Sequence, residues 1–191
     1  MRYSPEHKEQ SREKILEAAR QLFRSRGFEG ASIDQVMHAA GLTRGAFYAH
    51  FTSKDDLVRQ VLAIEAGLVQ TLRRAADSDD PWAAALSALS NYLDPAQRES
   101  VASGCPLVAH PVDAIRGDST RKAGYTERLA ALVESLETVV DGDDDAAVLV
   151  SVLAVGGGLL SSASSNTKLA DHIERVCLDQ IHNTLARHAA V

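Results

Sequence analysis

Cysteine, tryptophan and proline are scarce in this 191-residue sequence, which has two, one and five of them. Two cysteines, Cys105 and Cys177, are too few for a disulfide framework, and so few are typical of a reducing cytosol. The charged amino-terminal segment has no apolar core, so no secretory signal is expected. The longest aliphatic run, residues 148–160, is interrupted by glycines and is shorter than the roughly 20 residues that span a bilayer. We therefore expect a cytoplasmic protein with no membrane partner.

Sequence fingerprints of enzymes and metal sites are also missing. There is no G-x-S-x-G, no phosphate-binding loop and no glycine-rich dinucleotide motif. Cys105 and His110 are the residue types of a nucleophilic dyad, but five residues apart on one helix they would point in different directions. His110, His172, His182 and His188 do not have the spacing of metal ligands. We expect no cofactor, no structural metal and no enzymatic activity.

The composition is that of an ordinary globular protein, with 45% hydrophobic and 24% charged residues. The net charge of −6 is unevenly divided along the chain. Residues 1–54 contain nine lysines and arginines against six acidic residues, whereas residues 55–191 contain eleven against twenty. This asymmetry suggests two parts with different tasks. The basic excess is too small to establish nucleic-acid binding by itself.

The hydrophobic residues recur at helical spacing through most of the chain, and no strand pattern stands out. Ile15, Ala18, Ala19, Leu22 and Phe23 form the stripe of an amphipathic helix that ends at Gly27. The pattern predicts a short helix capped by Ser32, and further helices over 43–51, 53–74, 81–93, 125–140, 146–163 and 167–188. Ser53 followed by Asp56 approximates a capping box, and Pro81 suits a first helical position. Residues 94–119 contain three prolines and two glycines, and we expect at most one short helix there. The sequence therefore predicts an all-α fold.

Two short predicted helices joined around Gly41 form a helix-turn-helix candidate. Ile33, Val36, Met37, Leu42, Phe47 and Phe51 would face inward and fix the angle between them. Arg44 could offer a bidentate fork to guanine, or lie on solvated surface. Tyr48, His50 and Lys54 would contact phosphates. Alternatively, Tyr48 is an exposed side chain with no binding role, and His50 is a packing residue. The predicted DNA-binding residues are Ser32, Thr43, Arg44, Gly45, Ala46, Tyr48, His50 and Lys54.

The stretch from residue 13 to residue 62 resembles the DNA-binding domain of the TetR (tetracycline repressor-like) family. The resemblance rests on Ala18-Ala19, Leu22-Phe23, Gly27-Phe28, Ser32-Ile33, Ala40-Gly41, Gly45, Phe47-Tyr48, His50-Phe51, Lys54 and Leu57. It implies a three-helix DNA-binding domain over residues 1–54. It also implies a larger helical domain over residues 55–191 that binds an effector and forms a homodimer.

The last two predicted helices carry apolar stripes, and the rest of a single chain of this size is too small to bury both of them. We therefore expect a four-helix dimer interface. Three consecutive glycines, residues 156–158, would either allow two backbones to approach at the dimer axis or kink the helix. The predicted interface residues are Leu149, Val150, Leu153, Gly157, Leu160, Ile173, Val176, Cys177 and Ile181.

Cys105 precedes Pro106, and a helix beginning at Pro106 would favour the reactive thiolate of Cys105. This Gly-Cys-Pro segment resembles a subgroup of the family that includes electrophile- and oxidant-responsive members. Cys105 is then a possible redox sensor, or else a small residue that lines a pocket. A mostly apolar pocket would suit a small hydrophobic effector. The candidate pocket residues are Trp82, Leu86, Tyr92, Cys105, Leu107, Val108, His110, Tyr125 and Leu129.

These features predict a homodimeric transcriptional regulator that represses from a palindromic operator. A small hydrophobic or electrophilic effector would release it by changing the separation of its two DNA-binding heads. The alternatives are a cysteine-dependent enzyme and a protein-interaction module whose helix-turn-helix no longer binds DNA.

Overall fold

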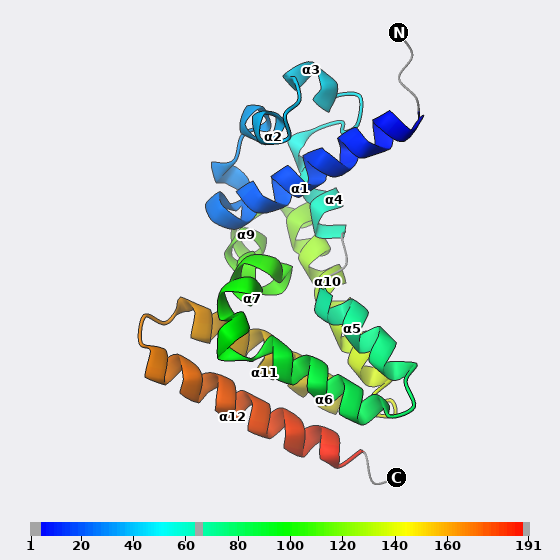
Figure 1. Cartoon of the computed structure of the whole chain (residues 1–191), viewed down its shortest axis with the longest axis vertical. Coiled ribbons are helices and arrows are strands. Elements are labelled where there is room, and N and C mark those ends of the chain that lie inside the picture. Colours follow the sequence, from blue (N-terminus) through cyan, green and yellow to red (C-terminus); the bar gives the residue numbers. More distant parts are fainter. Residues whose placement is uncertain (1–4, 64–66, 189–191) are drawn as a thin grey trace. The chain divides into compact units, whose positions relative to one another are not determined.

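The computed structural model describes residues 5–63 and 67–188, and every regular element in these ranges is helical (Figure 1). The predicted all-α fold is confirmed. The chain divides into two compact units. The first unit combines the described residues of Met1–Ile64 with His110–Gly124, and the second combines those of Glu65–Ala109 and Tyr125–Val191. The first unit thus continues beyond the expected boundary at residue 54 and recruits a segment from the middle of the chain.

The first unit is built from α1 (Pro5–Gly30), α2 (Ile33–Ala39), α3 (Arg44–Phe47), α4 (Lys54–Ala63), α9 (Pro111–Arg116) and the beginning of α10 (Ser119–Glu137). Four of the six residues predicted to face inward are buried, namely Val36, Met37, Phe47 and Phe51. Ile33 and Leu42 are partly buried and pack against the same core. The spacing of apolar residues therefore identified the core of this unit correctly.

The carboxyl end of α1 is where the 110–124 segment docks within the first unit. Gly27 has φ +68° and kinks α1, so the predicted helix end at this residue is confirmed as a break in the helical backbone. The next residue, Phe28, stacks on His110 with ring centroids 4.4 Å apart, and its backbone N–H donates to Asp113. Arg121 forms ion pairs with Glu29 and Asp55.

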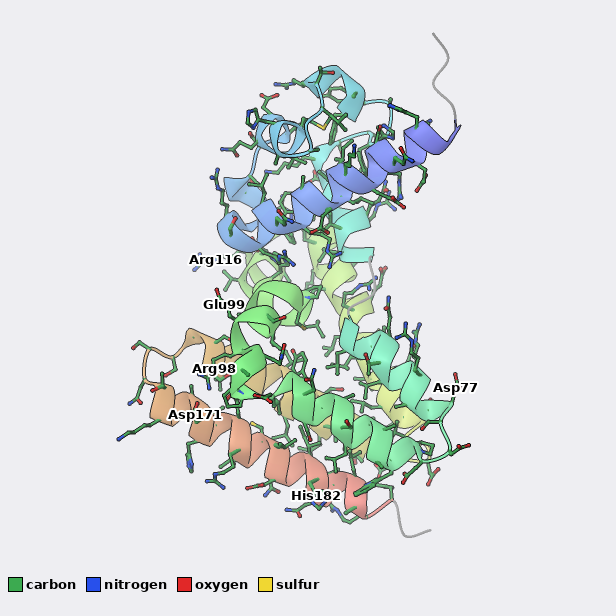
Figure 2. The ribbon with its side chains drawn as sticks, in the orientation of Figure 1. Asp77, Arg98, Glu99, Arg116, Asp171 and His182 are labelled. Carbon is green, nitrogen blue, oxygen red and sulfur yellow. The ribbon has the colours of Figure 1, made fainter. Side chains whose placement is uncertain are left out.

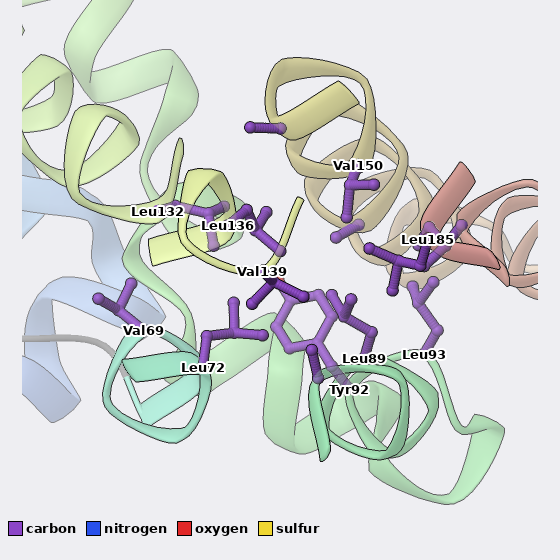
Figure 3. Close-up of a cluster of buried hydrophobic side chains, with 14 of the residues drawn as sticks. Val69, Leu72, Leu89, Tyr92, Leu93, Leu132, Leu136, Val139, Val150 and Leu185 are labelled. Atoms are coloured by element: carbon purple, nitrogen blue, oxygen red, sulfur yellow. The ribbon is translucent and has the colours of Figure 1, made fainter. Parts of the chain in front are cut away.

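The second unit contains α5 (Gly67–Ala76), α6 (Pro81–Tyr92), the 3₁₀ helix η1 (Pro95–Gln97), α7 (Arg98–Gly104), α8 (Pro106–Ala109), the rest of α10, α11 (Asp144–Ala163) and α12 (Thr167–Ala186). Its core is shown in Figure 3, where side chains from several of these helices converge around Tyr92. Pro81 is the first residue of α6, as the sequence predicted, and Asp80 caps this helix.

The expectation that residues 94–119 hold at most one short helix was wrong. Four short helices, η1, α7, α8 and α9, lie wholly in this stretch. Pro95, Pro106 and Pro111 each stand at the start of one of them. Proline is tolerated there because the first amide of a helix has no intrahelical acceptor. The prolines therefore begin helices in this segment rather than interrupt them.

The helix predicted over residues 53–74 is described in two parts, α4 and α5, and its middle, residues 64–66, lies outside the described residues.

Helices α11 and α12 match their predictions closely and lie side by side (Figure 1). By length and composition α11 is apolar enough to cross a membrane. Core helices of soluble proteins pass the same test, and α11 buries Ala147, Val150 and Ala154 in its own unit.

The three glycines lie within a continuous α11, so the alternative of a kink at this point is not observed. A Cβ atom added at Gly157 would lie 3.1 Å from both Cys177 Sγ and Leu93 Cδ2. One added at Gly158 would lie 3.2 Å from Val101. One added at Gly156 would meet nothing within 4 Å. Gly157 and Gly158 therefore allow close packing inside the subunit, and only Gly156 has open space beside it.

An ion pair connects α7 with α12 inside the second unit. The Arg98 guanidinium donates from Nε and Nη2 to the two carboxylate oxygens of Glu174, at 2.8 and 2.6 Å. It also donates to Asp171 at 2.6 Å, and both Arg98 and Asp171 are labelled in Figure 2. Glu174 is only 3% exposed. These carboxylates raise the pKa of Arg98, because they favour its charged form.

Candidate nucleic-acid interface

The turn between α2 and α3 is held by local hydrogen bonds. Ser32 caps α2, since its hydroxyl accepts from the Gln35 N–H at 3.2 Å, while the Gln35 side chain accepts from the Ser32 N–H. Gly41 has φ +69°, a conformation that favours glycine, and the Leu42 N–H donates to the Met37 carbonyl. The turn therefore has a defined geometry that sets the start of α3.

Helix α3 is shorter than the helix predicted over 43–51. It covers Arg44–Phe47, and the chain then continues in a turn in which the amides of Ala49 and His50 bond to carbonyls three residues back. Phe51 is buried beyond the end of the helix. The periodicity of Phe47 and Phe51 was consistent with both arrangements, because both place the two rings in the core.

Six of the eight residues predicted to contact DNA belong to α3 and its flanking turns, whereas Ser32 caps α2 and Lys54 begins α4. Thr43 is the N-cap residue of α3, but its side chain makes no capping bond. Gly45 has open space around it, and Ala46 is half-buried. Tyr48 is 59% exposed, with its ring edge packed on Phe47. Small residues with one exposed aromatic suit close approach to a nucleic-acid backbone.

Lys54 is the first residue of α4, where helix amides and dipole favour an anion. Asp56, two residues later, is already engaged by the protein. It accepts from the backbone and hydroxyl of Thr52 and from the side chains of Gln60 and Arg59. The Thr52 backbone bond and the Gln60 bond lower the pKa of Asp56 to about 2. The capping pattern predicted for Ser53 and Asp56 is present in part, since the Asp56 N–H donates to Ser53 Oγ.

His50 is half-buried, and its Nδ1 atom has no hydrogen-bond partner among the described residues. Burial lowers its pKa, and the positive charges of Lys8 and Arg12 lower it further. Sequence reasoning missed Lys8 and Arg12 at this surface. The only available signal was their one-turn spacing near the amino end of α1, which does not reveal the tertiary contact.

A cavity in the second unit has a volume of about 290 Å³. Of the nine candidate pocket residues only Tyr92 and Cys105 line it. Asn91, Gln97, Ser100 and Thr71 add polar groups that the sequence analysis did not single out. The full lining is Gly67, Leu68, Thr71, Ala88, Asn91, Tyr92, Gln97, Ser100, Val101, Gly104 and Cys105.

The other candidate pocket residues lie elsewhere. Leu107 and Val108 are buried in the hydrophobic core, and the Tyr125 hydroxyl donates to the Leu107 carbonyl at 2.9 Å. Leu129 is exposed on α10. His110 belongs to the first unit, where burial lowers its pKa and the bond with Asp113 opposes that shift. Trp82 packs on His182 at 5.8 Å between ring centroids, and Leu86 packs against the core.

Cys105 separates α7 from α8, and α8 begins at Pro106 as the sequence predicted. Helix α8 has only four residues, and Cys105 is only 7% exposed. The neighbouring Tyr92 hydroxyl is buried and has no hydrogen-bond partner of normal geometry among the described residues. Burial raises the pKa of Tyr92. Tyr92 and Cys105 are therefore neighbours in the core, and both line this cavity.

Some of the predicted interface residues lie on the exposed face of the α11–α12 pair, and others face the core of their own chain. Leu149, Leu160 and Val176 are exposed, whereas Leu153, Ile173 and Cys177 are half-buried. Val150, Gly157 and Ile181 are buried in their own chain and are not available to a second copy. The structure adds Val148, Val152 and Leu169 to the exposed apolar face.

Residues 15–61 match the model of the family described as "Bacterial regulatory proteins, tetR family". The uncharacterised HTH-type transcriptional regulator YfiR of Bacillus subtilis is 36% identical over 92 residues, which cover 47% of this chain and 42% of YfiR. The chain spans less than half the length of the curated relatives it matches.

Solved structures show the same fold. Escherichia coli NemR in its reduced form superposes with a TM-score of 0.76 at 19% identity, covering 91% of this chain and 95% of that one. SmeT, the repressor of a Stenotrophomonas maltophilia multidrug efflux pump, gives a TM-score of 0.64 at 20% identity, covering 93% and 89%. YfiR is thus described as a transcriptional regulator and SmeT as a repressor. These matches show that residues 15–61 are similar to the DNA-binding domain of the tetR family, and that the chain shares its fold with solved structures described as TetR-family regulators.

Proposed function

We propose that this protein is a cytoplasmic, homodimeric repressor that binds a palindromic operator and is released by a small-molecule effector. The observation that carries the proposal is the exposed surface of α3, where Thr43, Arg44, Gly45 and Tyr48 stand outward on a helix fixed from behind by Phe47. A helix-turn-helix places such a surface in the major groove. Two copies related by a two-fold axis would read an inverted repeat.

Phosphate contacts in this proposal come from the two ends of the α3–α4 segment. Tyr48 supplies an exposed hydroxyl, and Lys54 supplies a charge at the start of α4. Lys8 and Arg12 add positive potential around His50. Contacts of this kind hold the protein in register on the duplex, while base contacts provide the sequence specificity.

The dimer in this proposal forms through the exposed apolar face of α11 and α12. Leu149, Val152 and Leu160 lie on one side of α11, and Leu169 and Val176 lie on one side of α12. Large apolar side chains grouped on one face of a soluble protein mark an association surface. A second copy supplies the same face, so the contact is self-complementary.

The effector site in this proposal is the cavity lined by Tyr92 and Cys105. Its mixture of Leu68 and Val101 with Asn91 and Ser100 suits a small, largely apolar molecule that carries a hydrogen-bonding group. The 7% exposure of Cys105 supports its role as cavity lining more than as a freely accessible sensing thiol.

Replacing Lys54 with alanine is expected to weaken binding about equally for all DNA sequences. It should also reduce the slope of log K against log salt by about one for each head that loses a phosphate contact. Fluorescence anisotropy at several salt concentrations measures both quantities. Lys168→Ala, an exposed lysine of α12, is the control and should leave the slope unchanged. An unaltered slope in Lys54→Ala would remove Lys54 from the interface.

Replacing Val152 with glutamate should dissociate the dimer, because two carboxylates would be buried near the two-fold axis. Sedimentation velocity should then show a monomer, and operator affinity should fall because two linked heads become one. Leu129→Glu, at another exposed apolar residue, should remain dimeric. A wild-type protein that is monomeric and prefers no inverted repeat over bulk genomic fragments would overturn the proposed function.

A further inference from the structure

Arg44, the first residue of α3, is held by an acidic residue of α2. Its Nη1 lies 2.7 Å from Asp34 Oδ2, and both side chains are about three-fifths exposed. The two residues are ten positions apart, and the contact spans the helix-turn-helix from one helix to the other. No other ion pair involving α3 is found among the described residues of the first unit.

Both ends of this contact are rigidly placed. Asp34 lies in the first turn of α2, between Ser32 and Gln35, the two residues of the capping box. Arg44 begins α3 just after the Gly41 turn. A cation at a helix amino terminus is disfavoured by the helix dipole, and the Asp34 carboxylate offsets that effect. Because exposed ion pairs contribute little to stability, the contact matters more for where Arg44 points than for folding.

The geometry leaves Arg44 with a free recognition edge. Asp34 occupies Nη1, while no other hydrogen bond of the Arg44 guanidinium is found among the described residues. Guanine presents two acceptors, O6 and N7, to which an arginine fork binds in a bidentate manner. An arginine whose direction is already fixed loses less side-chain entropy on forming those bonds.

The Asp34 carboxylate has a second physical effect. It places a negative charge on the surface that faces DNA, where it repels phosphates whatever the base sequence. Non-specific binding is dominated by phosphate contacts, so this charge lowers it. A base contact by Arg44 regains the lost affinity only at sites with the correct base pair.

We propose that Asp34 is the positioning residue for Arg44, which it orients toward one guanine of each operator half-site, and that it thereby raises the ratio of specific to non-specific binding. This inference rests on the proposed DNA-binding function and adds to it a determinant of operator choice.

The test uses the full-length protein and an operator obtained by selection of bound genomic fragments. Affinities for that operator, for its single-base variants and for unrelated duplex are measured for the parent, Asp34→Asn, Asp34→Glu, Arg44→Ala and Asp34→Asn/Arg44→Ala. We expect Arg44→Ala to lose roughly 5- to 150-fold of discrimination at one base pair. Asp34→Asn should lose discrimination at the same base pair and bind unrelated DNA more tightly.

The double variant should be no less discriminating than Arg44→Ala, because Asp34 acts through the arginine. Asp34→Glu, which keeps the charge, should retain part of the discrimination. Side-chain NMR provides a readout without DNA. Rotation about the Arg44 Cζ–Nε bond should be slower in the parent than in Asp34→Asn.

Several outcomes would overturn the inference. Additive losses at two different base pairs would mean that Asp34 contacts DNA by itself. Unchanged discrimination in Asp34→Asn, or in Arg44→Ala, would show that the pair does not set specificity. Each of these results would leave the proposed function intact, provided that the parent protein selects an inverted repeat. A parent that selects none would refute the proposed function itself.

Discussion

Replacing Arg98 with alanine is expected to lower the free energy of unfolding of the second unit by about 3–5 kcal/mol. The Glu174 carboxylate is buried and accepts two hydrogen bonds from the Arg98 guanidinium. Without that guanidinium it would remain in a poorly solvated position with no compensating charge. Urea unfolding combined with hydrogen exchange of α7 and α12 amides measures the loss in this unit.

A matched control separates burial from charge. Arg175 also pairs with an aspartate, Asp179, at 3.0 Å, but both side chains are almost three-fifths exposed. Arg175→Ala should therefore cost less than about 1 kcal/mol. Replacing Arg98 and Glu174 together with methionine and leucine should recover much of the loss, because no buried charge is left alone. Equal costs for the Arg98 and Arg175 variants would contradict this account.

Phe47→Ala should destabilise the first unit by about 3–5 kcal/mol, the cost typical of removing a large buried ring. Phe47 is fully buried, and its ring centroid lies 5.4 Å from that of Phe51. The resulting cavity would lie directly under α3. Thermal unfolding followed by circular dichroism should show an earlier transition, and operator binding should fail because α3 is no longer held in place.

Tyr48→Ala is the informative comparison, because it removes the adjacent aromatic side chain from the surface. Its ring is mostly exposed and contacts Phe47 edge-on, so its loss should change stability by less than about 1 kcal/mol. DNA binding should still weaken for every sequence. If both variants unfolded equally early, the assignment of one ring to the core and the other to the interface would be wrong.

The sequence was most informative where a local rule determines the structure. The Ser32 cap, the Gly41 turn, the Pro81 helix start and the extents of α11 and α12 were all predicted, because each depends on residues a few positions apart. The inward-facing residues of the helix-turn-helix followed from helical periodicity in the same way.

Prediction was weakest where a feature depends on contacts between distant segments. Arg98 and Glu174 are 76 residues apart, and nothing in their local sequence marks them as partners. Periodicity shows that α11 has apolar positions all round, but it does not show that Val150 faces its own core while Val152 faces outward. His110 was grouped with the pocket because neighbouring residues are apolar, whereas its stacking partner, Phe28, lies 82 positions earlier.

That stacking partner also has a bearing on engineering. The first unit is discontinuous in sequence, since Asp113 and His110 complete the packing around the kink at Gly27. A chimera that transplanted only the amino-terminal 63 residues onto another sensor would leave the Phe28 ring uncovered. A functional graft would have to carry both the amino-terminal stretch and the α9 segment, or choose a recipient that supplies an equivalent imidazole and carboxylate.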